Sequence, residues 1–535
     1  MNSKLQENAA AASPEVRTSL VPSPQPPAPS RRAHLVGIGG CGMRALSQVL
    51  LAKGWRLSGS DLAIGGDDPL AKEGIRCFCG HAADQLSADV ECVIHSSAIS
   101  AANPELCCAA QRGIPVLSYA QMLGRLMQGR RGLAVAGTHG KSTTTAMAAE
   151  ILVAAGCDPT VIYGATPREG MHGGRSGEGQ IVLVEACEFQ RNFLQLCPCN
   201  AAILNIEPDH FDCYDTREAL ESAFARFAAL LPADGRLIVP WGDEATARVR
   251  AAASCRIETF AVVAGSAELV GWAERAPTGH HARMVGVGRR FPPHAPQPPA
   301  PSPQPLSPSS KPPDWLAENV QGQQGRYGFD LVHHGQSLGR IELSVLGRHN
   351  VSNAVAAAAL VAEPGVPPEA IIVGLSQFGG LRRRLEFKGT SGGIAFWDDY
   401  AHHPSEISTA LQTIREAIPE GRVCCLFQPH QALRTARLLD ELAFSLQNAE
   451  RVLIADIYRA REGSPQPGEI TAAHLAARTR ALGQDVPALH APVDIQQFLQ
   501  TRLTPGDVLV VMGAGDIGRI GYGLMDWFRE HRATG

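Results

Sequence analysis

The sequence predicts an α/β protein made of three units, each built on a mostly parallel β-sheet. Short runs rich in β-branched residues alternate with segments of helical periodicity along most of the chain, which is typical of such sheets. The chain has 535 residues, too many for one hydrophobic core. We expect the units at about residues 33–128, 129–382 and 383–535.

The predicted strands are short apolar runs bounded by glycine, proline or polar residues. They are Ala33–Ile38, Val90–His95, Gly132–Ala136, Ile181–Glu185, Ala201–Ile206, Arg236–Pro240, Arg422–Phe427, Arg451–Asp456 and Asp507–Met512. Two proline-rich segments interrupt this alternation: five of the eight residues of Pro22–Pro29 and eleven of the twenty-two residues of Pro292–Pro313 are proline. We expect residues 1–32 to form a disordered tail and about 292–313 a disordered insertion in the second unit, because such segments cannot build a core.

Composition and charge exclude several function classes. Lys+Arg 48 against Asp+Glu 52 gives a formal net charge of -4, and no basic run is interleaved with aromatic residues, which argues against a nucleic-acid partner. The longest apolar stretches are far shorter than the roughly 20 residues that cross a bilayer. The start of the chain also lacks the apolar core of a secretory signal, so we expect a cytoplasmic protein without membrane insertion. No two of the 14 cysteines form a C-x-x-C pair, which predicts buried free thiols.

The first glycine-rich loop indicates a diphosphate site. Gly37-Ile-Gly39-Gly-Cys-Gly42 follows a predicted strand and opens a helix, and Asp61 lies about twenty positions further on. Glycines in such a loop let the backbone approach a pyrophosphate at the helix N-terminus. Taken alone, the motif favours an NAD-binding domain, but a UDP-sugar satisfies the same geometry.

The second glycine-rich loop indicates nucleotide phosphates. Gly137-Thr-His-Gly140-Lys141-Ser142-Thr143 stands between a strand and a helix. Backbone N–H groups of such a loop cradle phosphates, the lysine reaches the β- and γ-phosphates, and the Ser142 or Thr143 hydroxyl holds Mg²⁺. The usual phosphate loop has a further glycine where this chain has Val135.

Ionisable side chains follow two later strands of the second unit. Glu185 and Glu188 follow one strand, and Glu207-Pro-Asp209-His210 follows another. Residues at the carboxyl ends of parallel strands face the ligand crevice, so these groups can complete a Mg²⁺ shell with a phosphate-loop hydroxyl. Each group taken singly can instead have a structural role, Glu188 as a helix cap and His210 as a turn histidine.

The third unit supplies three polar clusters. They are Arg382-Arg-Arg384, Asp398-Asp399-Tyr400-Ala-His402-His403, and Gln428-Pro-His430 with Arg434. Arginines beside a nucleotide can stabilise a transferring phosphoryl group, whereas we expect Arg382 to belong to a solvated face. A last glycine-rich segment, Gly513-Ala-Gly515-Asp-Ile-Gly518, lacks the downstream acid and is interpreted as a tight structural turn.

Taken together, these motifs resemble those of the Mur ligases of peptidoglycan synthesis. The matching segments, in order, are HLVGIGGCGM, SGSD, SSAI, AGTHGKSTTT, VEACEFQRNFL, NIEPDHFD, GRHNVSNA, RRRLEFKG, DDYAHHPSE, FQPHQALRT and GAGDIG. The resemblance implies a Rossmann-like N-terminal domain that binds a UDP-sugar, a central P-loop ATPase-like domain and a Rossmann-like C-terminal domain that closes over both. Within the family, the segments are most similar to the branch that uses ATP and Mg²⁺ to join L-alanine to the lactyl carboxylate of UDP-N-acetylmuramic acid.

The resemblance also implies roles for individual residues. The ATP-binding residues are Gly137, Thr138, His139, Gly140, Lys141, Ser142, Thr143, His349, Asn350, Asn353, Arg384 and Asp399. The UDP-sugar-binding residues are Gly37, Gly39, Gly40, Cys41, Gly42, Met43, Ser60, Asp61, Ser96 and Ser97. Alanine and the sugar carboxylate are held near Tyr400, His403, His430 and Arg434, and the metal by Ser142, Glu185 and His210. The catalytic residues are Lys141, His210, Arg384 and His403.

Three other functions are compatible with parts of the sequence. A Mur-type ligase could instead reattach a recycled tripeptide to the same sugar nucleotide, although FQPHQALRT and DDYAHHPSE favour alanine. An NAD-dependent dehydrogenase would leave Lys141 and His210 unexplained, and a non-catalytic sugar-nucleotide-binding relative is disfavoured by the intact phosphate loop. No lysine occurs between Lys141 and Lys311, so a carbamylated lysine of the kind that several sister ligases use is absent. Either a monomer or a homodimer is compatible with the sequence.

Overall fold

The computed structural model describes residues 31–64, 68–169, 173–263, 311–362, 365–460, 462–487 and 491–531. The predictions for the N-terminal tail and for most of the proline-rich insertion therefore lie outside the described residues, apart from the ends of both segments. Arg32, which we assigned to the tail, is the first residue of a strand. At the end of the insertion, Lys311 Nζ donates to Asp314 Oδ1 over 2.8 Å and Pro313 is buried, so disorder is the wrong prediction there.

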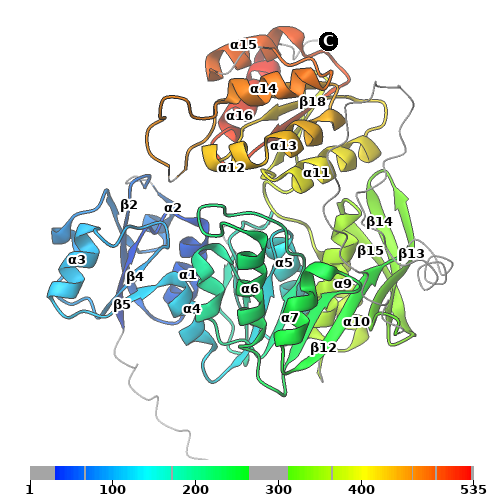
Figure 1. The fold of residues 1–535 in the computed structure, drawn as a ribbon. Coiled ribbons are helices and arrows are strands. Elements are labelled where there is room, and N and C mark those ends of the chain that lie inside the picture. Colours follow the sequence, from blue (N-terminus) through cyan, green and yellow to red (C-terminus); the bar gives the residue numbers. More distant parts are fainter. Residues whose placement is uncertain are drawn as a thin grey trace, which may run out of the picture.

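The first sheet is parallel and has the strand order β3-β2-β1-β4-β5, which is the Rossmann-like arrangement (Figure 1). Its strands are β1 (Arg32–Val36), β2 (Arg56–Asp61), β3 (Arg76–Cys79), β4 (Cys92–His95) and β5 (Val116–Ser118). The helices are α1 (Cys41–Ala52), α2 (Pro69–Lys72), α3 (Pro104–Gln111) and α4 (Tyr119–Met127). The first glycine-rich loop joins β1 to α1, at the carboxyl edge of this sheet.

The central sheet has the order β15-β14-β13-β12-β11-β10-β6-β9-β7-β8. Its strands are β6 (Arg131–Ala136), β7 (Thr160–Ile162), β8 (Gly174–Arg175), β9 (Ile181–Glu185), β10 (Asn200–Ile203), β11 (Arg236–Pro240), β12 (Arg256–Val262), β13 (Trp315–Gln323), β14 (Arg326–His333) and β15 (Gln336–Leu346). Strands β7 and β9 to β13 run parallel to β6, whereas β14 is antiparallel to both of its neighbours, β13 and β15. This antiparallel wing was not predicted.

Helices cover both faces of the central sheet (Figure 1). They include α5 (Lys141–Ala154), α6 (Arg217–Ala228), α7 (Ala247–Ala252), α9 (His349–Val361) and α10 (Pro368–Gln377). Five of the 13 residues of α9 are alanine, a residue type with high helix propensity and little bulk. Ala354 and residues 356–359, all alanines, are 0% exposed, because their small side chains let α9 approach the sheet closely. The start of α9 is thereby fixed beside the phosphate loop.

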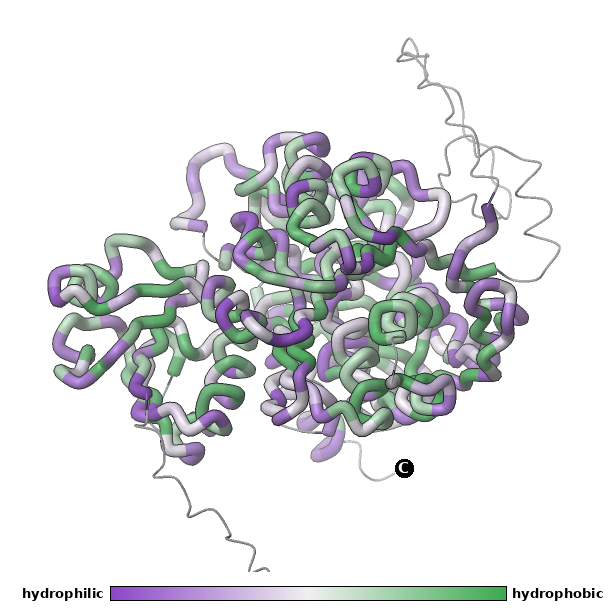
Figure 2. The backbone as a smooth tube through the Cα atoms, turned by 90° about the horizontal axis from the view of Figure 1, so that it is seen from below, coloured by the Kyte–Doolittle hydropathy of each residue, from purple (hydrophilic) through white to green (hydrophobic). Residues whose placement is uncertain are grey.

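The third sheet has the order β16-β17-β20-β18-β19, and only β16 is antiparallel to its neighbour among the described strands. Its strands are β16 (Glu386–Ser391), β17 (Ile394–Asp399), β18 (Arg422–Phe427), β19 (Arg451–Ile454) and β20 (Asp507–Met512). The helices include α11 (Pro404–Ala417), α12 (Ala432–Arg437), α13 (Leu439–Ser445), α14 (Ala472–Ala481), α15 (Pro492–Arg502) and α16 (Gly518–His531). Hydrophobic segments gather inside each unit, and hydrophilic ones lie at many outer turns (Figure 2).

The structure confirms the α/β class and corrects some strand limits. Four predicted strands, β9, β11, β18 and β20, have the predicted limits. The predicted strand Ala201–Ile206 ends at Ile203. The residues after Ile203 contact the phosphate loop instead, where Asn205 Oδ1 accepts from the His139 N–H. The strand predicted from Val90 starts at Cys92, since the Val90 N–H donates to Ser87 O in a turn.

Two further predictions concern the cysteines and the membrane. All 14 cysteines lie in the described residues and are free thiols, as predicted. Burial holds only for Cys92, Cys424 and Cys425; Cys41 and three others are exposed, so the prediction of buried thiols was too broad. Within the described residues, no helix combines the length and the apolar character needed to span a bilayer.

Candidate active site

The phosphate loop joins β6 to α5 and depends on two glycines with positive φ. Gly137 has φ +138° and Gly140 has φ +81°, in the region that favours glycine. A Cβ on Gly140 would lie 2.6 Å from Asn353 Oδ1, so the loop and α9 touch at this point. The Thr138 hydroxyl donates to Glu207 O over 3.0 Å. The loop is therefore held between α9 and the segment after β10.

Lys141 is the first residue of α5, and its ammonium group turns back over the loop. Nζ donates to Gly137 O over 2.5 Å and to Thr138 O over 3.0 Å, and forms an ion pair with Glu188 Oε2 at 3.0 Å. Burial by itself lowers the pKa of Lys141, but the Glu188 carboxylate outweighs it and raises that pKa. Lys141 therefore stays charged. Its ammonium group contacts two carbonyl oxygens and a carboxylate, which are acceptors that phosphate oxygens could replace.

The three predicted metal ligands belong to two separate contacts: Ser142 contacts Glu185, whereas His210 contacts Glu188. Ser142 Oγ donates to Glu185 Oε2 over 2.8 Å, and the Gly164 N–H donates to the same oxygen over 2.8 Å. His210 lies instead beside Glu188, with Nε2 at 3.4 Å from Oε1. Its Nδ1 is buried and has no hydrogen-bond partner among the described residues. A hydroxyl, carboxylates and an unpartnered imidazole nitrogen fit Mg²⁺ or another small divalent cation.

A cavity of about 310 Å³ joins the phosphate loop to α9 and the third unit. It is lined by most of the predicted ATP-binding residues, namely His139, Gly140, Ser142, Thr143, His349, Asn350, Asn353, Arg384 and Asp399. Gly137, Thr138 and Lys141 are not part of its lining. Apolar side chains such as Leu346, Phe378 and Leu381 line the same cavity, so it offers both polar and apolar walls. Residues of the central and third units thus line one shared pocket.

Asp399 shapes this pocket through the backbone. Its carboxylate accepts from the Leu385 N–H over 2.6 Å and from the Ala401 N–H over 2.7 Å. Burial raises its pKa to about 6. The guanidinium of Arg384 lies 5.0 Å from the ring centre of Tyr400, and Arg382 is exposed, as expected for a solvated face. Asp399 therefore fixes the loops that present Arg384 and Tyr400.

The central and third units meet in a charged cluster that we call the interdomain cluster: His139, Glu207, His403, Ser405 and Glu406. His139 Nδ1 lies 3.1 Å from Glu406 Oε1, and Nε2 lies 3.5 Å from Glu207 Oε2. Ser405 Oγ donates to Glu207 Oε2 over 2.5 Å. Ser405 and Glu406 stand in the first turn of α11 and end the segment DDYAHHPSE, but no role was predicted for either residue.

The pKa shift of His139 indicates that the interdomain cluster is an ion-paired contact. Burial lowers the pKa of His139, but Glu406 and Glu207 outweigh it and raise that pKa to about 9. Ligand atoms of His139, Glu207 and His403 lie within 4.8 Å of one another, a spacing that could hold a cation. His403 Nε2, however, lies 3.2 Å from Pro208 O, and Nδ1 accepts from the Ser405 N–H over 3.3 Å. Both nitrogens are engaged, which favours a protonated His139 over a metal here.

Arg434 forms a second buried contact between the units. Nε and Nη2 lie 2.8 Å and 2.7 Å from Asp209 Oδ1, and Nη1 lies 2.9 Å from His430 Nδ1. The side chains of Arg434 and Asp209 are only 4% and 6% exposed. Burial alone raises the pKa of Asp209, but Arg434 outweighs it and lowers that pKa far below its usual range. Of the predicted alanine-binding residues, Arg434 and His430 are thus in contact, and Tyr400 packs 5.6 Å from the neighbouring His402 ring.

The first glycine-rich loop is braced by its own unit. The Gly39 N–H donates to Asp61 Oδ2 over 2.9 Å, and a Cβ on Gly39 would lie 2.8 Å from that carboxyl carbon. The Ser60 hydroxyl is fully buried and donates to Glu105 Oε2 over 2.6 Å. The side chains of Asp61 and Ser60, which we predicted to bind the sugar nucleotide, therefore support the loop in this structure.

The other predicted residues of this loop differ in exposure. Gly37 turns the chain at φ +81° beside Ser96, with 3.0 Å between its constructed Cβ and that of Ser96. Gly40, Cys41, Gly42 and Ser97 lie on or next to the same edge of the sheet, whereas Met43 is buried in the core. The exposed part of the loop is thus mainly backbone.

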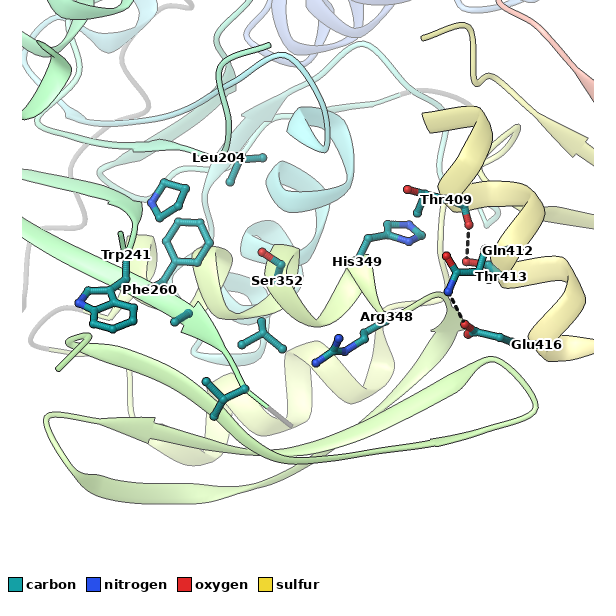
Figure 3. A pocket seen from close by; sticks show the side chains of 14 residues that line it. Leu204, Trp241, Phe260, Arg348, His349, Ser352, Thr409, Gln412, Thr413 and Glu416 are labelled. Carbon is teal, nitrogen blue, oxygen red and sulfur yellow. Dashed lines mark hydrogen bonds between the residues drawn. The ribbon is translucent and has the colours of Figure 1, made fainter. Parts of the chain in front are cut away.

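A second cavity, of about 580 Å³ (Figure 3), adjoins the cavity beside the phosphate loop. Its walls come from β11, β12, α9 and α11, and Leu204, His349, Ser352 and Thr409 line both cavities. A Cβ on Gly347 would lie 2.3 Å from His349 Cε1, so a glycine is required where the His349 ring packs. The sequence contained no signal for this second cavity.

The fold and the site together define a multidomain P-loop α/β protein whose central and C-terminal units share one pocket. Three domain models match in chain order: "Mur ligase family, catalytic domain" at residues 32–131, "Mur ligase middle domain" at 135–283, and "Mur ligase, glutamate ligase domain" at 383–515. The chain therefore belongs to the Mur ligase family, as its motifs indicated.

Curated relatives span nearly the whole chain. A UDP-N-acetylmuramate–L-alanine ligase of Clostridium novyi is 35% identical over 92% of this chain and 96% of its own. One from Salinibacter ruber is 37% identical over 94% of this chain and 96% of its own. Among solved structures, the UDP-N-acetylmuramate-alanine ligase of Thermotoga maritima has a TM-score of 0.71 at 23% identity and covers 93% of this chain and 99% of its own. That likeness supports the fold.

Proposed function

We propose that this protein is an ATP-dependent ligase that joins L-alanine to the lactyl carboxylate of UDP-N-acetylmuramic acid and releases ADP and phosphate. The observation that carries the proposal is the pocket in which the phosphate loop, the asparagines of α9 and Arg384 of the third unit meet. Curated relatives that bear the corresponding name cover almost the full chain. Peptidoglycan precursor synthesis is the process that this reaction serves.

Activation of the carboxylate is the first step that the site must support. A carboxylate is a poor acyl donor, so the γ-phosphoryl group of ATP passes to it and creates an acyl phosphate. Lys141 loses its contacts with Gly137 O and Thr138 O and turns to the transferring phosphate, while Arg384 approaches from the third unit. Cations placed on both sides spread the developing charge.

A divalent cation would be held by Ser142 and Glu185, with His210 Nδ1 as a further ligand. Bound there, such an ion neutralises phosphate charge and orients the nucleotide. The His210 ring is oriented by Glu188, whose Oε1 lies 3.4 Å from His210 Nε2 and leaves Nδ1 to bind the ion. Glu188 itself is anionic: burial alone raises its pKa, but Lys141 and His210 outweigh it and lower that pKa.

The alanine amine must be neutral when it attacks the acyl phosphate. Burial and the neighbouring His139 lower the pKa of His403, so this ring is neutral near pH 7. Its Nδ1 accepts from the Ser405 N–H over 3.3 Å, a long contact that must break before this nitrogen takes a proton, and lies 3.7 Å from Glu207, which would stabilise an imidazolium. We assign the general-base role to His403 Nδ1 and alanine-carboxylate binding to Arg434 with His430.

The alternative functions have less support. No feature of the described residues favours a recycled tripeptide as the amine substrate. Asp61, which a dehydrogenase would use for the ribose of NAD, accepts a hydrogen bond from the Gly39 N–H. A cytoplasmic location and a monomeric or homodimeric state remain predictions of the sequence.

The proposal is tested by phosphate release from ATP and Mg²⁺ with UDP-N-acetylmuramic acid and single amino acids. We expect turnover with L-alanine, weaker turnover with glycine, since one methyl group is worth about 1 kcal/mol, and ADP as the nucleotide product. Formation of AMP, or preference for a tripeptide over alanine, would refute it.

A further inference from the structure

Tyr119 lies where the first unit meets the central unit, and no sequence motif singled it out. It is the first residue of α4, and the start of this helix is fixed by a reciprocal cap. The Ser118 hydroxyl accepts from the Gln121 N–H over 3.1 Å, and the Gln121 side chain accepts from the Ser118 N–H over 2.9 Å. The ring of Tyr119 is thereby held at a defined position.

The phenol group packs against the first turn of α1. A Cβ on Gly42 would lie 3.0 Å from Tyr119 Oη and 3.1 Å from Cζ. Gly42 is the second residue of α1, so its lack of a side chain makes room for the phenol. The first backbone N–H groups of a helix have no partner within the helix, and this end carries partial positive charge. The Tyr119 hydroxyl therefore lies beside backbone N–H groups of α1 that can donate to an anion.

Two properties of the hydroxyl make it a donor to a ligand. It has no hydrogen-bond partner among the described residues. Burial raises the pKa of Tyr119 strongly, and the nearby carboxylate of Glu185 adds to this effect, so the phenol stays protonated. The Tyr119 side chain is part-exposed, so a ligand oxygen can reach this hydroxyl.

We propose that the Tyr119 hydroxyl donates a hydrogen bond to the diphosphate of the UDP-sugar. This inference rests on the proposed function, because it concerns how the same substrate is held. Its position beside the first turn of α1 favours the diphosphate over the sugar ring, since diphosphates bind at this end of a helix in Rossmann-like folds. Tyr119 is then a substrate-positioning residue beside the first glycine-rich loop.

The test compares Tyr119→Phe with the unchanged protein in calorimetric titrations with UDP and with UDP-N-acetylmuramic acid. Tyr522→Phe is the matched control, because the Tyr522 hydroxyl contacts Asp398 in the third unit. Loss of a hydrogen bond to a charged oxygen should raise both dissociation constants by about tenfold or more in Tyr119→Phe and leave them unchanged in the control. Steady-state kinetics should show a higher KM for the UDP-sugar with kcat and the KM for ATP nearly unchanged.

Two outcomes would overturn the inference. One is equal affinity of Tyr119→Phe and the unchanged protein for UDP. The other is a loss confined to UDP-N-acetylmuramic acid, which would move the contact from the diphosphate to the muramyl group. Binding of UDP without any binding of UDP-N-acetylmuramic acid by the unchanged protein would refute the proposed function, and the UDP titrations would still decide the role of Tyr119.

Discussion

The interdomain cluster should make the contact between the central and third units depend on pH. His139 carries the effect, since Glu406 lies 3.1 Å and Glu207 3.5 Å from its two nitrogens, with the His403 ring 4.5 Å away. The perturbation is a rise in pH, compared with Glu406→Gln, which removes one carboxylate and keeps its shape. Both should loosen the contact, because both weaken the attraction between the imidazolium and the carboxylates.

The magnitude follows from the pKa of His139. It is raised from 6.5 to about 9 when the units are in contact. Each pKa unit corresponds to about 1.4 kcal/mol, so a proton held over this interval stabilises the contact by about 3 kcal/mol at most. A raised pKa gives stabilisation that is complete below pH 6.5 and is lost as pH rises through about 9. Glu207, with a pKa lowered to about 2, keeps its contribution from about pH 4.5 upward and loses it toward pH 2.

Two measurements test this reasoning. Nuclear magnetic resonance of ¹³C-labelled histidines, with the signal assigned by His139→Asn, should give a His139 titration midpoint near 9, and Glu406→Gln should lower it. Small-angle X-ray scattering should show a larger radius of gyration at pH 9.5 than at pH 6. A His139 midpoint at or below 6.5, or identical scattering at both pH values, would show that the cluster does not hold the units together.

Three other changes have defined expected outcomes. Lys141→Ala should retain the fold and lower turnover by at least about a hundredfold, because it removes a charge beside the transferring phosphoryl group; near-normal turnover in a folded variant would contradict its assignment. Arg434→Ala should raise the KM for alanine at least tenfold and leave the affinity for the UDP-sugar, measured by calorimetry, unchanged. Asp209→Asn, which retains Arg434, is the control. It shows how much of the effect comes from breaking the buried Arg434–Asp209 pair, which can cost about 3–5 kcal/mol. Replacing residues 292–310 by a short Gly/Ser link should shift the melting temperature little, since loop length costs about 0.6 kcal/mol per doubling; a large loss of stability or activity would show that the segment contacts the enzyme.

Local patterns in the sequence predicted much of the architecture. The strands Ile181–Glu185 and Asp507–Met512 have the limits that their apolar runs indicated, and both glycine-rich loops stand between a strand and a helix. The antiparallel wing of β13, β14 and β15 was missed, because exposed polar residues occupy much of β13 and β15 and leave only short apolar runs. The end of the strand Ala201–Ile206 was misplaced because Asn205 bonds to His139, which lies 66 positions earlier.

The sequence by itself determined the class of the protein: the phosphate loop, the glycine-rich loop at β1 and the ordered motifs of a Mur ligase. The reason is that loops and periodicities are local, so neighbouring residues specify them. Only the tertiary structure decided that His139 meets Glu406 across 267 positions, that Asp209 holds Arg434, and that Tyr119 stands beside α1. These contacts depend on how separately folded units dock, and no local pattern of residues records that geometry.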